Sequence, residues 1–393
     1  MKILYITLEN LSLHKGSVVH IKEVIDGLQR RGHQVGLIAS AWGRPENIDH
    51  FYNINLKKLS PFKLLGPKRK LYLISSVLLF LYLFKVLWQY DIIYARDFHT
   101  VIIALLPRLL FRKKLVFEIN GIANEEQRLK SHSILSNILA FFVKKAEKIA
   151  TRWSDRIVSV TPQIATYLTH YFNCQPDKVN IISNGVNTKR FYPINDEGLL
   201  SILRKRLGIA KEDLVVVFAG NLAPWQGLEN LIRVTPALTR QVENIRFLII
   251  GDGTLKDKLI EQVNNLGISD HFVFTGMVDY QHIPTYINIG DICVLPKRRL
   301  KSGYSPLKLY EYMACGKPII SSRIEGLEFI ESEEVGLLME PEDIESFEKV
   351  LIELAKDPKR RKDMGQKASE LARKKFDWEL KLIEIEKILQ RLA

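Results

Sequence analysis

The stretch SPLKLYEYMACGKPII, residues 305–320, places a lysine and a glutamate three positions apart near the start of a predicted helix. Ser305 is the expected N-cap of this helix, and Pro306 fits its first turn, where the missing N–H group costs nothing. Lys308 and Glu311 then lie on one face, because residues three apart are neighbours on a helix surface.

This pair has two interpretations. In a binding site, the carboxylate accepts hydrogen bonds from two neighbouring hydroxyl groups, such as those of a ribose, and the lysine contacts a phosphate. An ammonium group about 4 Å from one phosphate charge gains roughly 4 kcal/mol at an effective dielectric constant of about 20, before desolvation. As a simple ion pair on a helix, the two side chains would contribute only about 0.2–0.5 kcal/mol.

Two glycine-containing loops precede other predicted helices and are suited to binding an anion. In FAGNLAPWQGLENLI, residues 218–232, an apolar strand ends at Gly220 and a helix follows a short loop, while Gly16 and Ser17 stand at the start of the helix predicted for 18–32. A glycine lets backbone N–H groups approach a phosphate, and a helix N-terminus carries about half a positive charge. Each loop is also compatible with an ordinary turn into a helix. His20, one turn into its helix, either faces a cleft or packs inside.

Apolar strands alternate with amphipathic helices along the chain, which predicts parallel sheets covered by helices. The predicted strands are 2–7, 34–40, 91–97, 114–121 and 156–161 in the first half, and 213–222, 246–253, 271–278, 291–296 and 317–322 in the second. The Asn-, Gly- and Pro-rich segment 184–198 reads as a linker. We therefore expect two doubly wound, Rossmann-like α/β domains, 1–190 and 191–375, facing each other across a cleft. The helix 376–393 is expected to pack back on the first domain.

Composition and charge restrict the class of protein. The chain has 393 residues, 47% of them hydrophobic, which is ordinary for a globular protein with a sizeable core. Three cysteines far apart in the sequence exclude a disulfide framework and fit a reducing compartment. The net charge of +13 indicates a polyanionic partner. Nucleic acid is not expected, because no aromatic–basic RNA motif or helix-turn-helix spacing occurs.

An apolar segment follows a basic one in the first half. KKLSPFKLLGPKRK, residues 57–70, ends in Lys68, Arg69 and Lys70, and residues 71–88 contain Lys85 as their only charge. Three interpretations stay open: a buried or groove-lining helix, an interfacial helix beside a basic patch on anionic lipid, or a membrane span at the lower limit of length.

The ordered series of motifs resembles the retaining GT-B glycosyltransferases of family 4. The series is FAGNLAPWQGLENLI, LIIGDGTLKDKL, VFTGMV, DICVLP, SPLKLYEYMACGKPII, GLEFIE and GLLM, and the first half adds the Gly16 loop, VSVTPQIATYL and KVNIISNGVNTKRFYP. The resemblance covers nearly the whole chain. It implies transfer of a sugar from a nucleotide-sugar, here a UDP-sugar, to a lipid-linked or polysaccharide acceptor, with retention of anomeric configuration.

Carried over residue by residue, the resemblance implies a modified donor site. Glu311 matches the family's second motif glutamate, which holds the donor ribose, whereas Gly303 stands where the first is expected. The family's two diphosphate-binding cations fall on Asn221 and Gln226. Lys308 is the expected replacement, and we consider Arg298 and Arg299 its possible helpers.

Further residues complete the implied sites. The backbone of Met277 and Val278 matches the segment that reads the base, and main-chain groups around Gly303–Leu307, including Ser305 and Leu307, are left to meet the donor sugar. The family's histidine in the first domain aligns with Asn120, and the acceptor-side candidates Asp97 and His99 are nearby. The chain contains no Asp-x-Asp motif, so no metal is expected, and no cofactor either, because the nucleotide-sugar is a substrate.

The expected setting is the cytoplasmic side of the plasma membrane, where a peripheral enzyme assembles a surface polysaccharide or glycolipid. Alternatives with the same architecture are a sugar-nucleotide epimerase, a phosphorylase, or a non-catalytic relative that binds a donor or a membrane.

Overall fold

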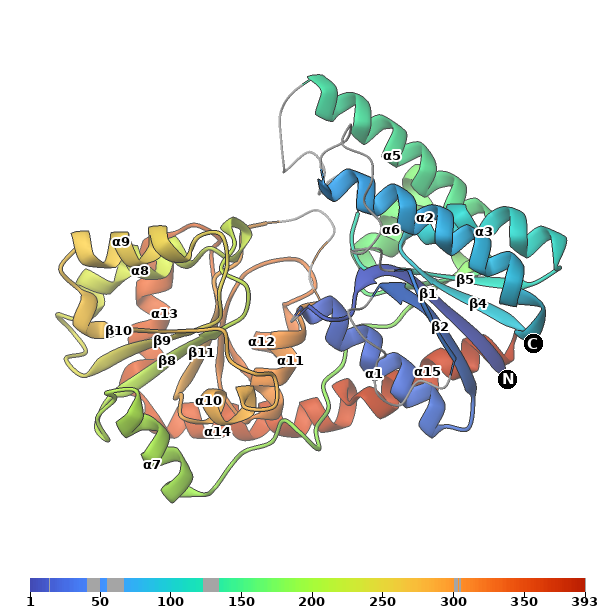
Figure 1. Cartoon of the computed structure of the whole chain (residues 1–393). Coiled ribbons are helices and arrows are strands. Elements are labelled where there is room, and N and C mark those ends of the chain that lie inside the picture. The colour runs from blue at the N-terminus through green and yellow to red at the C-terminus, as the bar shows by residue number, and fades with distance from the viewer. Residues whose placement is uncertain are drawn as a thin grey trace. The chain divides into compact units, whose positions relative to one another are not determined.

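The computed structural model describes residues 1–13, 15–40, 50–54, 67–122, 134–299, 303 and 305–392, with the side chains of 67–73 and 134–139 excepted (Figure 1). The chain divides into two compact units. Unit 1 comprises Met1–Asn184 and Trp378–Ala393, and unit 2 comprises Gly185–Asp377. The division between the units falls at the start of the segment predicted as a linker.

The described residues of unit 1 form a seven-stranded parallel sheet with the order β3-β2-β1-β4-β5-β6-β7. Its strands are β1 (Lys2–Asn10), β2 (Gln34–Ser40), β3 (His50–Asn53), β4 (Ile92–Arg96), β5 (Lys114–Ile119), β6 (Arg156–Ser159) and β7 (Val179–Ile181). The five strands predicted in this half are confirmed. β3 and β7 were not predicted, because both are short edge strands whose residues are only partly buried and lack an apolar run.

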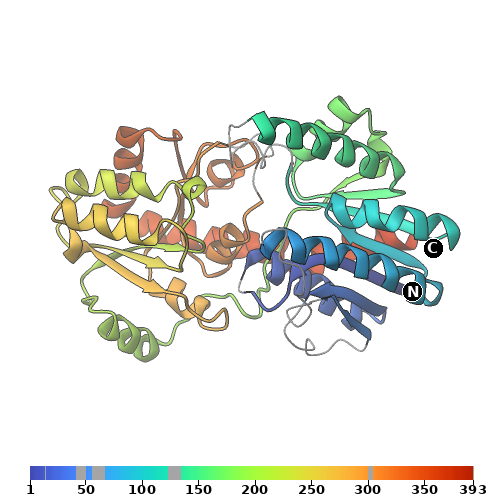
Figure 2. The same ribbon diagram turned by 45° about the horizontal axis from the view of Figure 1, so that its top comes forward.

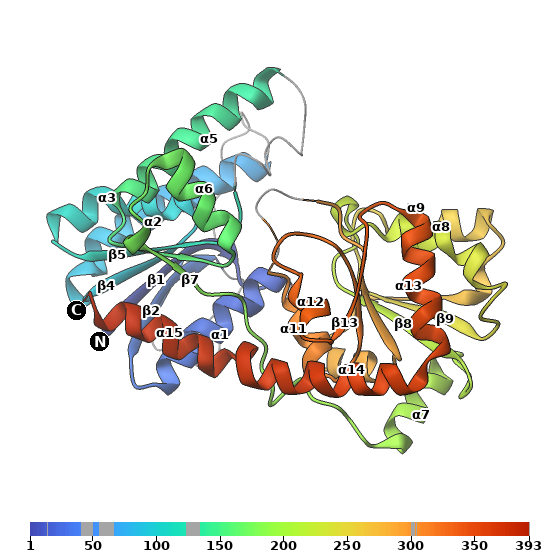
Figure 3. The same ribbon diagram turned by 180° about the vertical axis from the view of Figure 1, so that it is seen from behind.

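Helices cover both faces of this sheet. They are α1 (Gly16–Arg30), α2 (Pro67–Val86), α3 (Phe98–Leu110), α5 (Ile134–Trp153), α6 (Pro162–Phe172) and α15 (Trp378–Gln390). Figures 1 and 3 show α1 and α15 on one face and α2, α3, α5 and α6 on the other. Figure 2 turns the second group toward the viewer, and within it α3 packs against both α2 and α5.

Helix α2 covers most of residues 71–88, and it has a buried side and an exposed side. Leu79, Leu83 and Val86 are buried in the core of unit 1, which fits a helix that packs on the sheet. On its outer side, however, Val77 is 53% and Leu81 56% exposed. Within the part of the chain that the structure describes, no helix has both the length and the apolar character needed to cross a membrane.

Unit 2 is built around a six-stranded parallel sheet with the order β10-β9-β8-β11-β12-β13. Its strands are β8 (Leu214–Ala219), β9 (Ile245–Ile250), β10 (Phe272–Gly276), β11 (Ile292–Leu295), β12 (Ile319–Ser322) and β13 (Gly336–Met339). The five predicted strands are confirmed here too. β13 was not predicted as a strand, although it is as long as β11 and β12; it lies at the edge of the sheet, where it pairs only with β12.

The helices of unit 2 are α7 (Glu197–Arg206), α8 (Leu228–Leu238), α9 (Lys256–Asn265), α10 (Ile283–Asn288), α11 (Leu307–Ala314), α12 (Phe329–Ser332), α13 (Ile344–Lys356) and α14 (Pro358–Leu371). Residues of α8, α9 and α13 form one core with the sheet, and residues of α10, α11, α12 and α14 form the other. A parallel sheet covered in this way opens to ligands at the carboxyl ends of its strands.

The last helix, α15, packs against α1 of unit 1. The close approach depends on Gly27, because a Cβ atom there would lie 2.1 Å from Leu382 Cδ1 and 2.9 Å from Leu382 Cγ. At the edge of this contact, Arg31 and His33 both contact the partly buried Glu386, with 2.8 Å between His33 Nε2 and Glu386 Oε1. The packing of α15 is therefore tight at its centre and held by charges at its edge.

A double-mutant cycle tests this contact. Gly27→Ala is expected to lower the free energy of unfolding by about 1–3 kcal/mol through overpacking, and Leu382→Ala by about 2–5 kcal/mol through a cavity. In the double variant the new methyl group enters that cavity, so the combined loss should be smaller than the sum by about 1 kcal/mol or more. Urea unfolding of the four proteins measures this coupling, and strictly additive losses would contradict the contact.

Candidate functional site

Helix α11 is held beside the carboxyl end of β8 by Tyr312. The Tyr312 hydroxyl accepts a hydrogen bond of 2.7 Å from the backbone N–H of Ala219 and lies 3.4 Å from the carbonyl oxygen of the same residue. Complete burial raises the pKa of Tyr312 well above its usual value, so the hydroxyl stays neutral. The first turn of α11 is thereby placed next to Gly220, the residue that follows β8.

Lys308 extends from this first turn toward Gly220. Its Nζ atom lies 3.3 Å from Gln226 Oε1 and 4.0 Å from the centroid of the Phe218 ring. A Cβ atom at Gly220 would come within 2.4 Å of this Nζ, and the φ angle of Gly220 is +142°, so only glycine fits. Burial lowers the pKa of Lys308 well below its usual value. The positive charge of Lys297 acts in the same direction, and Glu311 opposes both.

Glu311 is buried one turn further along α11, with 8% of its surface exposed. Its Oε1 atom accepts a hydrogen bond of 2.9 Å from the hydroxyl of Tyr280. Tyr280 was not identified from the sequence, because nothing in the local pattern relates residue 280 to residue 311. Burial of the carboxylate does not fit the interpretation of Lys308 and Glu311 as an exposed ion pair.

The predicted N-cap of α11 is wrong. The helix begins at Leu307, and Pro306, with an extended ψ of 124°, occupies the cap position without a side-chain hydrogen bond. Ser305 Oγ instead lies 3.1 Å from the hydroxyl of Tyr310. Gly303, where the resembled family has a glutamate, is buried with a φ angle of +65°, a backbone conformation that a glutamate would adopt only under strain.

The other predicted donor-side residues differ in position. Gln226 is buried beside Lys308, whereas Asn221 is exposed. Met277 follows β10 and is 60% exposed, and Val278 packs against the core of unit 2.

The two arginines named as helpers of Lys308 form ion pairs with acidic side chains. The distances are 3.4 Å from Arg298 Nε to Glu342 Oε1 and 3.7 Å from Arg299 Nη2 to Glu340 Oε2.

Unit 1 contains a buried carboxylate at the end of β5 that sequence reasoning missed. Glu118 is 1% exposed, and four polar groups surround it: His20 Nε2 at 2.9 Å, Tyr94 Oη at 2.9 Å, Asn120 Nδ2 at 2.8 Å and Arg96 Nε at 3.5 Å. Burial alone would raise the pKa of Glu118, but the charges and hydrogen bonds of these neighbours, His20 first, lower it to about 2. The sequence signal is a lone acidic residue within the apolar strand KLVFEI.

This cluster is linked to the start of α1. Arg96 Nη1 donates a hydrogen bond of 2.7 Å to the carbonyl oxygen of Ser17, and His20 Nδ1 lies 2.7 Å from Asn184 Oδ1. His20 is therefore a packed residue of the cluster. In the first turn of α1, Gly16 is exposed and Ser17 is half-buried, and the N-cap Lys15 makes no side-chain capping bond.

The acceptor-side candidates Asp97 and His99 and the residue aligned with the family's histidine, Asn120, border the same cluster. Asp97 follows β4 with a φ angle of +77° and caps α3, since its Oδ1 accepts a 3.1 Å hydrogen bond from the backbone N–H of Thr100. His99 Nδ1 is 3.6 Å from Asp97 Oδ1 and half-exposed, and Asn120 is exposed beyond its hydrogen bond to Glu118. The strand ends bring these side chains together, and their role in catalysis stays a prediction.

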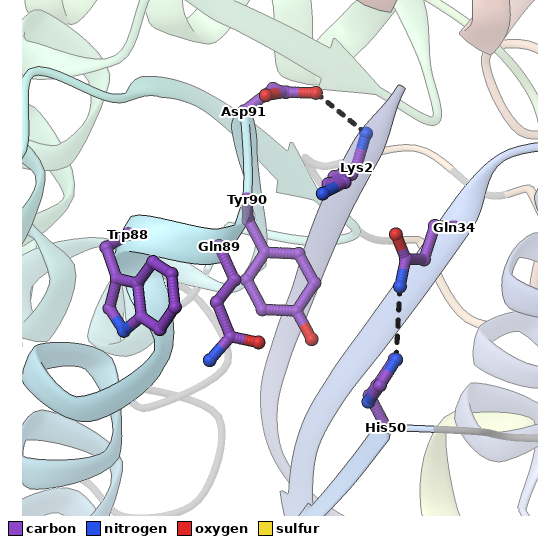
Figure 4. Close-up of a pocket in the computed structure, with 7 residues that line it drawn as sticks. All are labelled: Lys2, Gln34, His50, Trp88, Gln89, Tyr90 and Asp91. Atoms are coloured by element: carbon purple, nitrogen blue, oxygen red, sulfur yellow. Dashed lines mark hydrogen bonds between the residues drawn. The ribbon is translucent and has the colours of Figure 1, made fainter.

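A pocket at the opposite end of the unit 1 sheet is lined by few groups that could take part in catalysis. Figure 4 shows its lining residues, Lys2, Gln34, His50, Trp88, Gln89, Tyr90 and Asp91. The backbone N–H of Lys2 donates 2.8 Å to Asp91, and Gln34 Nε2 lies 3.1 Å from His50 Nε2. These groups satisfy one another at the amino ends of the strands, where ligands of parallel sheets are not normally bound. Among the residues described, no group of three or more His, Cys, Asp or Glu side chains could hold a metal ion.

The buried carboxylate predicts a pH-dependent stability. The lowering of the Glu118 pKa from 4.5 to about 2 corresponds to roughly 3 kcal/mol of stability. This contribution is complete above pH 4.5 and is lost as the pH falls toward 2, because protonation removes the charge that His20 and Arg96 contact. Glu118→Gln should therefore destabilise the protein by about this amount at pH 7 and by much less at pH 3.

Urea unfolding at the two pH values measures the effect. Glu379→Gln is the matched control, because Glu379 forms an exposed pair with Arg30 at 2.9 Å and its loss should cost under about 1 kcal/mol at either pH. An equal destabilisation by Glu118→Gln at pH 7 and pH 3 would contradict the prediction.

Two family models match the chain. Residues 14–190 match the model described as Glycosyltransferase Family 4, and residues 201–371 match the model described as Glycosyl transferases group 1. Among similar curated proteins, an uncharacterized glycosyltransferase of Methanocaldococcus jannaschii is 24% identical over 84% of this chain and 83% of its own. A GDP-mannose-dependent monoacylated alpha-(1-6)-phosphatidylinositol monomannoside mannosyltransferase of Corynebacterium glutamicum is 28% identical over 61% of this chain and 65% of its own.

Solved structures share the fold. Sucrose-phosphate synthase from Thermosynechococcus elongatus superimposes with a TM-score of 0.80 at 19% identity, covering 100% of this chain and 98% of its own. HepE of Anabaena, solved in complex with UDP-glucose, has a TM-score of 0.76 at 18% identity and covers 100% of both chains. The two matched models, the two parallel sheets and these neighbours agree, and the chain belongs to the GT-B glycosyltransferases of family 4.

Proposed function

We propose that the enzyme transfers a sugar from a UDP-sugar to a lipid-linked or polysaccharide acceptor, with retention of configuration and without a metal ion. The observation that carries the proposal is the arrangement of Gly220, Gln226, Lys308 and Glu311 at the carboxyl end of β8. It combines a buried carboxylate for the ribose with an ammonium group for the diphosphate. The complex of HepE with UDP-glucose supports the class of donor.

The chemical step in this proposal depends on charge stabilisation. As the bond between sugar and diphosphate breaks, negative charge develops on the leaving phosphate oxygen, and fixed positive groups stabilise it most where water is excluded. Lys308 would supply one such group. Backbone N–H groups of the loop after Gly220 and of the start of α8 would supply others. With retention, the leaving phosphate itself can accept the proton of the acceptor hydroxyl, so this proposal assigns no base among Asn120, Asp97 and His99.

A screen tests the proposed function. UDP-, GDP- and ADP-sugars are each added to the protein, because a ligand that binds only the folded state raises the melting temperature. The enzyme should release free UDP from the stabilising UDP-sugar only when an acceptor is present. Isomerisation of the sugar without release would support an epimerase instead, and binding without any turnover would support a non-catalytic relative.

Glu311 should determine the affinity for the nucleoside part of the donor. Loss of two hydrogen bonds to a charged group costs about 1.5–3 kcal/mol each, so Glu311→Ala should weaken UDP binding by about a hundredfold or more. Glu311→Gln keeps the size and the acceptor for Tyr280, and should lose less. Calorimetry with UDP measures both variants, and Glu243→Ala, at an exposed glutamate of unit 2, is the control. Near-normal UDP affinity in Glu311→Ala would remove the ribose assignment.

The membrane part of the proposal is carried by the outer surface of α5, α3 and α2. Large apolar side chains are exposed along these helices: Val77 and Leu81 on α2, Leu106, Leu109 and Leu110 on α3, and Phe141, Phe142, Ile149 and Trp153 on α5. Exposed Lys144, Lys145, Lys148 and Arg152 alternate with the apolar residues of α5. This combination suits the headgroup region of an anionic bilayer.

One contact on α5 shows how charge and apolar surface are combined. The ammonium group of Lys145 lies 4.5 Å from the centroid of the Phe141 ring. A lysine in this position covers an aromatic ring and still presents its charge to lipid phosphates. The sequence had indicated α2 and the basic residues Lys68, Arg69 and Lys70 as the membrane-binding part, but the side chains of these three residues lie outside the described residues. The basic side chains on which this proposal depends are those of α5.

Liposome flotation tests this surface. Replacing Lys144, Lys145 and Lys148 with glutamine should weaken binding to vesicles that contain phosphatidylserine by roughly a hundredfold, since each lysine contributes about 1 kcal/mol. The matched control replaces the exposed Lys349, Lys359 and Lys362 of unit 2 and should float like the wild type. If both triple variants float equally well, α5 is not the membrane-binding surface.

A further inference from the structure

Lys297 is a buried lysine at the carboxyl end of β11 that the donor site described above does not use. It is 5% exposed, and its backbone N–H donates a hydrogen bond of 2.8 Å to the carbonyl oxygen of Leu295. A Cβ atom at Gly227, the N-cap of α8, would lie 1.8 Å from the carbonyl oxygen of Pro296 and 3.8 Å from the backbone nitrogen of Lys297. Lys297 therefore lies beside the N-terminus of α8.

Lys308 reaches the same edge of the sheet from α11. Because β8 and β11 are adjacent parallel strands, the residues that follow them meet at one end of the sheet. The two lysines are close enough for the positive charge of Lys297 to lower the pKa of Lys308. The loop from Asn221 to Gly227 contains neither lysine nor arginine, so these two side chains bring positive charge to a loop that has none of its own.

Two neighbouring ammonium groups under burial are costly while no anion is bound. Burial lowers the pKa of Lys297 to about 7, and burial and the charge of Lys297 together lower that of Lys308 well below its usual value. A multiply charged anion placed between them would replace this repulsion with attraction to both. The nearby N-terminus of α8 favours an anion at the same point.

We infer that Lys297 is a second diphosphate-binding residue, which together with Lys308 holds the two phosphates of the nucleotide-sugar donor in front of α8. This inference rests on the proposed function and deepens it, because it names the groups that contact the diphosphate. In the course of the reaction, both ammonium groups would stabilise the negative charge of the departing nucleoside diphosphate.

The arrangement has a measurable consequence in proton uptake. Lys308 on α11 is near enough to be affected by the charge of Lys297, and the adjacent Arg298 pairs with Glu342. With a pKa of about 7, Lys297 is mostly neutral at pH 8 in the free protein, and a bound diphosphate raises that pKa. UDP is fully ionised at pH 8, because the second ionisation of a phosphate has a pKa of about 6. Binding of UDP at pH 8 should therefore take up protons from the buffer.

Calorimetry at pH 8, in buffers of different ionisation enthalpy, measures affinity and proton uptake together. UDP and GDP are the probes, and uridine and guanosine, which lack phosphates, are their controls. Lys297→Met should weaken diphosphate binding about tenfold or more, leave nucleoside binding unchanged, and reduce proton uptake. Lys297→Arg should retain affinity and also take up fewer protons, because arginine is already charged. The matched control is Lys317→Met, at another buried lysine of unit 2, whose Nζ donates 2.8 Å to the carbonyl oxygen of Asn288.

The outcomes separate this inference from the proposed function. Unchanged diphosphate affinity and proton uptake in Lys297→Met would overturn the inference alone, as would an equal loss of nucleoside and diphosphate binding, since that indicates a structural role. If the wild type binds neither UDP nor GDP, the proposed donor class fails, and the role of Lys297 fails with it.

Discussion

The candidate site of unit 2 depends on one physical constraint, which is the burial of positively charged side chains at the carboxyl end of a parallel sheet. Strand residues there are apolar and buried, so a lysine at this edge loses most of its hydration. Lys308 is tolerated because its ammonium group contacts the Phe218 ring and Gln226, and because Gly220 leaves room for it. The same features that make the charge costly in the free protein make a bound diphosphate favourable.

The position of α11 follows from that constraint. Its first turn must present Lys308 to Gly220 and Glu311 to Tyr280, which requires the helix to be fixed against β8. Tyr312 fixes it by pairing with both the N–H and the carbonyl group of Ala219, beyond the end of the ladder with β11. A helix of only eight residues has little stability of its own, so these tertiary contacts determine where its functional side chains lie.

Unit 1 also buries a charged side chain at the carboxyl end of its sheet, and here the charge is negative. Glu118 is a buried anion at the end of β5. Its partners are His20 from α1, Tyr94 and Arg96 from β4, and Asn120, which follows β5. Arg96 also holds the carbonyl group of Ser17, so the carboxylate is connected to the first turn of α1. The candidates Asp97, His99 and Asn120 thus lie next to a buried polar network, which can position groups on the loops of a parallel sheet.

The sequence by itself determined the class of fold, ten of the thirteen described strands and the glycine loops. These features depend on local periodicity and on backbone freedom, which neighbouring residues reveal. The order of motifs along the chain also indicated the family and singled out Glu311 and Lys308. The strands β3, β7 and β13, which escaped prediction, each lie at the edge of a sheet and pair with a single neighbouring strand.

Only the tertiary structure decided which polar side chains meet. Tyr280 and Glu311, Lys308 and Gln226, and His20 and Glu118 are 31, 82 and 98 residues apart, and no local pattern connects them. It also moved the cap of α11 from Ser305 to Pro306 and showed Lys297 to be buried. The physical reason is that burial and pairing of charge arise when distant segments pack together, whereas periodicity is a property of one segment alone.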